Sequence, residues 1–294
     1  MLTPSSILQA RRWYAEEFRY KAKVSSPALV DAFATVHRED FVGRGPWRFL
    51  SPMNAAEYWT SDDADPRHVY HDVLIALDEE RGINNGLPSL WAYLFDHVEI
   101  KTGDHVLHLG CGTGYYTAIA AELTGTAGSV TAIEIDPMLA EKARAALSAW
   151  HQVQVRNQDG AQTTFDPVDV IMVSAGATHP LPSWLNALRP RGRLLFPMTT
   201  ARRGPGAMLL ATRCHTEGFA ARFLCRAEFI DFQGARDARI GDRLAAALIR
   251  DRGAPVKSLR QDVHIEDETC WLHERDWCLS VLDLSLLAQD ERRR

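Results

Sequence analysis

The sequence lacks a long apolar run. No stretch of about 18 consecutive apolar residues occurs in the 294 residues, which is the minimum for a membrane-spanning helix. A secretory signal is absent as well, because charged side chains occupy the region that would have to be apolar. These are Arg11, Arg12, Glu16, Glu17 and Arg19. We therefore expect a protein that has no membrane partner and works in the cytoplasm.

Cysteine is also scarce. The five cysteines are odd in number and widely spaced, at positions 111, 214, 225, 270 and 278. Neither a disulfide framework nor a CxxC-type zinc site has this spacing. His68 and His71 are three residues apart, but two histidines without a Cys or acidic partner at ligand spacing are a weak zinc signal. The sequence thus predicts reduced thiols and no metal site.

The chain has no large excess of charge of either sign. The formal net charge is −5, from 33 basic and 38 acidic residues, so the broad positive surface that attracts phosphate backbones is missing. The composition, 46% hydrophobic and 24% charged, is that of an ordinary globular protein. We exclude nucleic acid as a partner. The GxSxG elbow and the P-loop lysine signature are missing too, which argues against esterases and NTPases.

The N-terminal region carries a helical pattern. Apolar residues recur at three- and four-residue spacing from Pro4 to about Val42, which predicts two amphipathic helices. Ser26 and Pro27 suit the N-cap and the first position of the second helix. Residues 43–67 are rich in Gly, Pro, Asp and aromatics and indicate a long ordered loop or extended arm. A strand over 69–77 and a helix over 88–98 are expected next.

From residue 104 onward, strand-like and helical segments alternate, which specifies a mainly parallel sheet covered by helices. The expected strands are 105–109, 129–135, 153–156, 168–173 and 193–197, and the expected helices are 115–123, 138–150 and 183–188. Residues 208–214 and 219–232 indicate a β-hairpin around Glu217 and Gly218. The predicted fold class is α/β, with a Rossmann-like sheet and helices on both of its faces.

Three glycines lie at alternate positions between a predicted strand and a predicted helix. They are Gly110, Gly112 and Gly114, with Cys111 and Thr113 between them. Glycine is required where the backbone turns tightly and a ligand comes within contact distance. A helix N-terminus at such a turn suits a polar ligand. The GxGxG spacing differs from the GxGxxG of dinucleotide sites and disfavours a nicotinamide oxidoreductase.

Two acids follow the next two strands. Glu134 ends the second strand, where a carboxylate can accept both hydroxyl hydrogens of a ribose. Asp159 and Gly160 follow the third strand, where the carboxylate can bind an adenine amino group while the backbone runs close to the ring. Alone, Asp-Gly is a common turn pair and Glu134 could be a surface acid. Their order after the glycine turn favours a ligand site.

These elements, followed by the segments 169–175 and 188–197, resemble the class I S-adenosylmethionine-dependent methyltransferases. Within that class the sequence resembles the protein-L-isoaspartate O-methyltransferases, a likeness that includes residues 36–42 and covers about residues 20–235. The resemblance implies S-adenosylmethionine as cofactor, with S-adenosylhomocysteine as product. It implies a binding site formed by Gly110, Cys111, Gly112, Gly114, Tyr115, Glu134, Ile135, Asp159, Gly160 and Ser174.

The chain departs from this family at two places. His108 stands where the class normally has an acid, two residues before the first glycine. The repair enzymes carry a Gly-x-Thr-Ile-Ser-x-Pro segment, and here residues 82–88 have Asn84 in place of the threonine and Gly86 in place of the serine. The scaffold is retained while the acceptor side is altered, so we do not expect efficient isoaspartyl methylation.

Methyl transfer is an in-line displacement, so the protein must hold the acceptor close to the methyl group and aligned with the leaving sulfur. A general base helps only where the acceptor has a proton to lose. The candidate catalytic residues near the carboxyl ends of the strands are His179, Asn84, Asn85, Tyr115 and His71. His179 follows the fourth strand of the sheet and can act as a base near neutral pH, although a lone loop histidine is more often structural.

The predicted division is residues 1–98 as N-terminal helices and acceptor-side arm, 99–235 as the cofactor-binding domain and 236–294 as a C-terminal extension. The expected function is methylation of a small molecule or modified peptide at O, N or S. The alternatives are isoaspartate repair and a catalytically silent cofactor-binding module. The acceptor, the oligomeric state and the role of the extension remain open at this stage.

Overall fold

The computed structural model describes residues 4–51, 53–200, 204–214 and 218–284. The chain forms two compact units. Unit 1 contains residues 1–104 and 111–157, and unit 2 contains residues 105–110 and 158–294. The chain therefore passes between the units three times, once within the glycine turn, between Gly110 and Cys111. The domain boundaries expected from the sequence are contiguous and differ from this division, so they stay a prediction.

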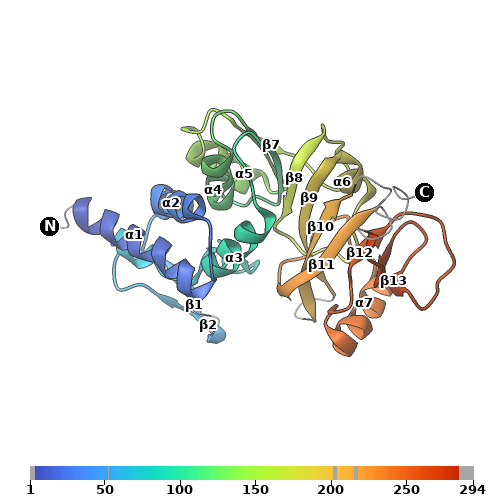
Figure 1. The fold of residues 1–294 in the computed structure, drawn as a ribbon. Helices are drawn as coiled ribbons and strands as arrows, with labels where there is room; N and C mark the ends of the chain where they lie inside the picture. The colour runs from blue at the N-terminus through green and yellow to red at the C-terminus, as the bar shows by residue number, and fades with distance from the viewer. Residues whose placement is uncertain (1–3, 52, 201–203, 215–217, 285–294) are drawn as a thin grey trace. The chain divides into compact units, whose positions relative to one another are not determined.

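Unit 1 begins with two helices that lie side by side (Figure 1). They are α1 (Pro4–Lys21) and α2 (Pro27–Thr35), as the apolar spacing predicted. The Ser26 side chain caps α2 by accepting a hydrogen bond from the Leu29 N–H, which confirms the predicted cap. The rings of Phe18 and Phe33 meet edge to face at 4.9 Å between the two helices.

The next part of unit 1 is a small antiparallel sheet with strand order β2-β1-β3-β4. Its elements are η1 (Arg38–Phe41), β1 (Arg48–Ser51), β2 (Asn54–Thr60), η2 (Pro66–Val69), β3 (Leu74–Asp78) and β4 (Ile83–Asn84). The region predicted as an ordered loop or extended arm therefore contains a hairpin, and the strand predicted over 69–77 begins five residues later. Phe49 on β1 is buried between Trp59 and Ile75, and this pairing across strands was not visible in local sequence.

The remainder of unit 1 follows the predicted alternation. Its elements are α3 (Pro88–Val98), α4 (Tyr115–Thr124), β6 (Ser129–Glu134), α5 (Pro137–Ala146) and β7 (Val153–Asn157). β6 and β7 are parallel neighbours. The Asp136 carboxylate caps α5 by accepting hydrogen bonds from two backbone N–H groups. α5 ends four residues before the predicted position.

Unit 2 contains the strands β5 (His105–Leu109), β8 (Val168–Val173), β9 (Leu188–Thr199), β10 (Gly206–Arg213) and β11 (Phe219–Arg226). β5, β8 and β9 are parallel, whereas β10 pairs antiparallel with β9 and β11. The short helix α6 (Pro182–Ala187) connects β8 to β9. The predicted hairpin is confirmed in its strands, although Glu217 in its turn lies outside the described residues.

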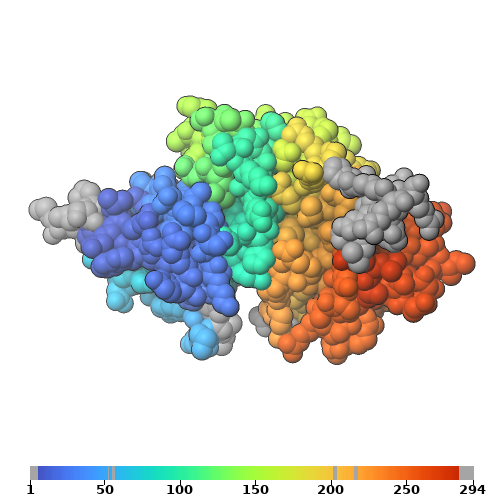
Figure 2. All heavy atoms as spheres, in the orientation of Figure 1, coloured from blue at the N-terminus to red at the C-terminus, as the bar shows by residue number. Residues whose placement is uncertain are grey.

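The C-terminal extension continues the sheet of unit 2. It consists of α7 (Ala238–Asp251), β12 (Ser258–Arg260), β13 (Cys270–His273) and β14 (Cys278–Ser280). β12 pairs with β11 and β14, and β14 pairs with β13. The orange and red atoms of this part of unit 2 form a continuous surface on the face shown in Figure 2. In the described part of the chain, no helix combines the length and the apolar character that a bilayer span requires.

Candidate active site

The glycine turn is fixed by backbone hydrogen bonds within unit 1. The Cys111 N–H donates to the Ile133 carbonyl at 3.1 Å, and the Gly114 N–H donates to the Cys111 carbonyl at 2.9 Å. The Gly112 N–H donates to the Glu134 carboxylate at 2.8 Å. Gly112 has φ +58°, and a Cβ built there would meet only Leu77, at 3.9 Å. The turn is thus held in the left-handed region with open space beside Gly112.

Glu134 is buried, with 6% of its surface exposed. Its carboxylate accepts hydrogen bonds from the backbone N–H groups of Gly112 and Asp136, at 2.8 and 3.0 Å. Burial raises the pKa of Glu134, while these two N–H groups act in the opposite direction. The predicted ribose-binding acid therefore also orients the glycine turn. A carboxylate has lone pairs for further donors, so binding a diol here does not require either contact to break.

Ile135 and Thr113 complete this side of the site. Ile135 is 40% exposed although it is apolar, and Asn157 Nδ2 donates to its backbone carbonyl at 3.0 Å. The Thr113 hydroxyl is buried and has no hydrogen-bond partner among the described residues. A buried hydroxyl without a partner is rare in folded proteins. Its oxygen has almost no exposed surface, so a ligand at the turn does not reach it in this conformation.

Asp159 and Gly160 lie in unit 2, in the loop after β7. The Asp159 carboxylate accepts hydrogen bonds from the Ala161 N–H at 2.9 Å and from Gln162 Nε2 at 2.8 Å. The Gly160 carbonyl accepts one from Trp184 Nε1 at 3.2 Å. Both residues thus stabilise the loop that carries them. Their predicted contact with adenine stays a prediction.

Ser174 at the end of β8 contacts His108 on β5, both in unit 2. The His108 Nε2 and Ser174 Oγ atoms are 2.7 Å apart. His108 is 1% exposed, and burial lowers its pKa to about 3. The imidazole is therefore neutral at physiological pH. The departure from the class pattern at position 108 replaces an acid with a neutral, buried side chain that positions Ser174.

The buried imidazole makes the stability of the protein depend on pH. In the unfolded chain a histidine titrates near 6.5, whereas His108 in the folded chain titrates at about 3. As the pH falls below about 6.5, His108 therefore binds a proton in the unfolded state but not in the folded state. The contribution of His108 to the free energy of unfolding is largest above pH 6.5. It falls by about 2 kcal/mol between about pH 6.5 and 4.5.

The test is urea unfolding of the natural protein and of His108→Gln at these two pH values. The glutamine keeps a polar partner for Ser174 and does not titrate. The natural protein should lose about 2–3 kcal/mol more than the variant on acidification. Equal losses in the two proteins would show that His108 is protonated without cost.

The predicted acceptor segment, residues 82–88, is anchored in unit 1 by Arg38. The Arg38 side chain is fully buried. Its Nε donates to Asn85 Oδ1 at 3.2 Å, and its two terminal nitrogens donate to the carbonyls of Val69, His71 and Val73, each at 2.9 Å. One guanidinium thus joins the acceptor segment to the chain around η2. Sequence analysis did not select Arg38, because a single arginine after a helix carries no local signal.

The other predicted catalytic residues have different surroundings. Asn84 Oδ1 accepts a hydrogen bond from the Gly86 N–H at 2.9 Å. The Tyr115 hydroxyl is buried 3.2 Å from the Tyr14 hydroxyl, so a role in catalysis would require this contact to break. The His71 side chain is exposed. Partial desolvation by its neighbours lowers its pKa, which favours the neutral imidazole.

His179 lies in unit 2 after β8. Its Nδ1 is 2.9 Å from the Thr178 hydroxyl. Burial lowers the pKa of His179, against the opposing effect of Asp237. The imidazole is thus predominantly neutral near pH 7. Its chemistry permits the predicted role as a base, which stays a prediction.

Comparison with known sequences shows the family of the chain. The family of protein-L-isoaspartate(D-aspartate) O-methyltransferases matches residues 14–212. A relative from Ignicoccus hospitalis, a protein-L-isoaspartate O-methyltransferase, is 33% identical over 170 residues, which are 56% of this chain and 78% of the relative. A second such relative, from Archaeoglobus fulgidus, is 37% identical over 115 residues, which are 38% of this chain and 52% of the relative.

Solved structures share the fold. A protein-L-isoaspartate O-methyltransferase structure matches with a TM-score of 0.61 at 23% identity, over 81% of this chain and 69% of that one. A Plasmodium falciparum structure, described as a putative member of the family in complex with S-adenosyl-L-homocysteine, matches with a TM-score of 0.59 at 14% identity, over 76% and 98%. The mixed α/β fold with a mostly parallel central sheet and N-terminal helices is confirmed. The chain belongs to the protein-L-isoaspartate(D-aspartate) O-methyltransferase family and is an S-adenosylmethionine-dependent methyltransferase.

Proposed function

We propose that the methyl acceptor is the carboxylate of an isoaspartyl residue in a peptide or protein. The observation that carries this proposal is the family match over residues 14–212, which includes the whole acceptor segment. The altered residues at 84 and 86 had favoured a small molecule or another modified peptide. The structure offers a local explanation for Gly86 that leaves the acceptor unchanged.

Gly86 is required by its surroundings. Its φ is +74°, and a Cβ built there would lie 2.9 Å from Trp91 Nε1 and 3.1 Å from a ring carbon of Tyr116. The Trp91 and Tyr116 rings are stacked with their centroids 4.8 Å apart. The Tyr116 hydroxyl also donates to the Gly86 carbonyl at 3.2 Å. Packing against this ring pair therefore accounts for glycine here, without any change of acceptor.

Asn85 presents hydrogen-bond donors. Its Oδ1 faces Arg38, which has donors and no acceptor, so the orientation of the amide is determined. The Nδ2 group, with two N–H donors, is on the opposite side of the amide. Donors of this kind suit a carboxylate, which only accepts hydrogen bonds. We assign Asn85 a role in holding the acceptor carboxylate.

The residues around the glycine turn fit the cofactor. Gly112 leaves space at the turn, and Glu134 is the acid for the ribose. The cofactor contacts expected of Asp159 and Ser174, which lie in unit 2, stay predictions. When bound, S-adenosylmethionine supplies a methyl group activated by the positive sulfur.

A carboxylate acceptor simplifies the demands on the protein. An isoaspartyl carboxyl has lost its proton well below neutral pH, so no side chain has to act as a general base. The protein has to exclude water and hold the acceptor oxygen in line with the methyl group. Neutral His71 and His179 are compatible with this task, and neither has to titrate during turnover.

The test follows a labelled methyl group from S-adenosylmethionine to an isoaspartyl peptide and to the matched aspartyl peptide. We expect transfer to the isoaspartyl peptide with a preference of at least about tenfold. Asn85→Asp keeps an acceptor for Arg38 and replaces the amide donors with a negative charge. This variant should raise KM for the peptide about tenfold or more, or about 1.4 kcal/mol, and leave the affinity for S-adenosylhomocysteine unchanged.

Two results would contradict the proposal. Equal labelling of both peptides would show that the isoaspartyl linkage is not recognised. No labelling of either peptide by protein that binds S-adenosylhomocysteine would direct the search to small-molecule acceptors, the function favoured by residues 84 and 86 alone.

A further inference from the structure

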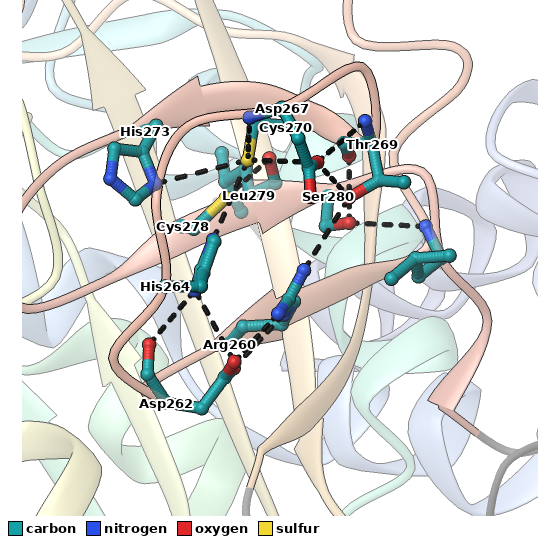
Figure 3. Close-up of polar contacts among 11 residues, drawn as sticks. Arg260, Asp262, His264, Asp267, Thr269, Cys270, His273, Cys278, Leu279 and Ser280 are labelled. Carbon is teal, nitrogen blue, oxygen red and sulfur yellow. Dashed lines mark hydrogen bonds and ion pairs between the residues drawn. The ribbon is translucent and has the colours of Figure 1, made fainter.

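The C-terminal extension brings together two cysteines and two histidines. They are His264, Cys270, His273 and Cys278, and their ligand-type atoms all lie within 4.8 Å of one another. Figure 3 shows the four side chains pointing toward one another at the end of the β13–β14 hairpin. All four lie in unit 2 and outside the residues that match the methyltransferase family. Their role is therefore separate from the proposed site of methyl transfer.

The strands explain how the cluster forms. His273 on β13 lies directly opposite Cys278 on β14, so both side chains are on the same face of the sheet. Cys270 is three residues before His273, which in a regular strand would place it on the opposite face. The pairing shifts by one residue between Cys270 and Leu272. This bulge returns Cys270 to the face of the other two side chains.

His264 reaches the cluster from the loop between β12 and β13. Its Nδ1 is 2.9 Å from the Asp262 carbonyl, which can only accept a hydrogen bond. Nδ1 therefore carries the proton, and the lone pair of Nε2 points at Cys270 Sγ, 3.4 Å away. This is the usual arrangement of a metal-binding histidine, in which the second ring nitrogen is held by a backbone carbonyl or carboxylate. Its neighbours Val263 and Ile265 are 97% and 89% exposed, so the loop is anchored through the intervening imidazole.

The distances match a four-coordinate ion. A tetrahedron with metal–sulfur bonds of about 2.3 Å and metal–nitrogen bonds of about 2.0–2.1 Å has edges of about 3.3–3.8 Å. Cys270 Sγ is 3.4 Å from His264 Nε2 and 3.8 Å from His273 Nδ1. The longest separation in the cluster, at most 4.8 Å, has to shorten by about 1 Å on binding. Small side-chain rotations are sufficient for this.

We propose that the extension holds one Zn²⁺ ion through His264, Cys270, His273 and Cys278. Two thiolates and two neutral imidazoles are a preferred ligand set for zinc, and the two negative charges neutralise the ion. The Cys270 sulfur also lies 3.5 Å from the Asp267 N–H, a donor suited to a bound thiolate. Four protein ligands leave no open position, so the site is structural. It joins the loop 261–269 to β13 and β14.

The sequence predicted no metal site, because it contains no CxxC pair. The ligands are instead spaced by six, three and five residues along 264–278. One cysteine and one histidine are brought to the same face only by the bulge, which local sequence did not reveal.

The first experiment is elemental analysis of the full-length protein, produced without a histidine tag and purified under reducing conditions without chelator. We expect about one zinc per chain. Cys270→Ser and Cys278→Ser should reduce the zinc content to below about one tenth per chain, and Cys225→Ser, a half-buried cysteine on β11 outside the cluster, should retain it. Zinc retained in a Cys270→Ser, Cys278→Ser double variant would overturn the proposal.

A second measurement does not depend on the folding of a variant. The natural protein is stripped with chelator and titrated with Co²⁺, which gives intense visible bands and thiolate charge-transfer bands in a tetrahedral sulfur and nitrogen site. We expect these bands to saturate at one equivalent and to disappear when Zn²⁺ is added. Absence of zinc from the purified protein together with absence of the cobalt bands would refute the site.

Discussion

Gly112→Ala should weaken the binding of S-adenosylhomocysteine by at least about tenfold, or about 1.4 kcal/mol, in a protein that still folds. The added Cβ meets no atom of unit 1 closer than Leu77 at 3.9 Å, so the protein itself has room for it. The cost in stability comes from the left-handed φ of +58° and amounts to about 1–2 kcal/mol. The methyl group would occupy the space that the glycine turn leaves for a ligand. Calorimetric titration of the purified variant measures the affinity.

Gly103→Ala is the matched control. Gly103 also has positive φ, +87°, with nothing within 4 Å of a Cβ built there, and it lies in the turn before β5, away from the glycines of the site. This variant should show a similar loss of stability and bind S-adenosylhomocysteine normally. An equal loss of affinity in both variants would mean that backbone strain, and not a contact with the ligand, explains the effect of Gly112→Ala.

Arg38→Met should lower the free energy of unfolding by about 3–5 kcal/mol. The methionine fills much of the volume, but it leaves Asn85 and the carbonyls of Val69, His71 and Val73 without their buried donor. The contacts with Asn85 and the Val69 carbonyl are fully buried, and each such acceptor that loses its partner costs about 1–3 kcal/mol. The guanidinium also lies 5.8 Å from the centre of the Tyr115 ring, and this cation–π contact is lost as well. Denaturant unfolding measures the change.

Arg12→Met provides the comparison for Arg38. Arg12 is exposed on α1 and pairs with Glu16 and Asp31, so its removal should change the stability by no more than about 0.5 kcal/mol. A similarly small change in Arg38→Met would show that water replaces the guanidinium and that the acceptor segment does not depend on it.

The sequence was sufficient to predict the elements whose periodicity is local. α3 and β8 have the predicted bounds, and the cap of α2 by Ser26 is as expected. The hairpin of β1 and β2 was missed, because its core residue Phe49 is buried by Trp59 and Ile75, its partners on neighbouring strands. The strand pairing of the extension was not predicted for the same reason, since β12 is recognisable as a strand only by its pairing with β11 and β14.

Prediction of the candidate site was limited in the same way, because contacts between residues far apart in the sequence could not be predicted. Gly112 and Glu134 could be identified because a strand, a turn and an acid stand in a fixed order along the chain. The hydrogen bond between them adds a structural role to the predicted one. Arg38 and the His108–Ser174 pair depend on contacts over 31 to 66 positions of sequence. Such contacts leave no periodic signal, so only the folded structure shows them.

The division of the chain has a consequence for its biosynthesis. β5 leads into the glycine turn but belongs to unit 2, where it pairs with β8. His105 and Asp169, which are hydrogen-bonded at the start of this pair, are 64 positions apart. At about 5–20 residues per second, a ribosome needs about 3–13 seconds to produce the partner strand. The strand that leads into the glycine turn therefore has to wait for its partner β8 while most of unit 1 is already outside the ribosome, whereas the turn itself can form earlier through its hydrogen bonds to Ile133 and Glu134.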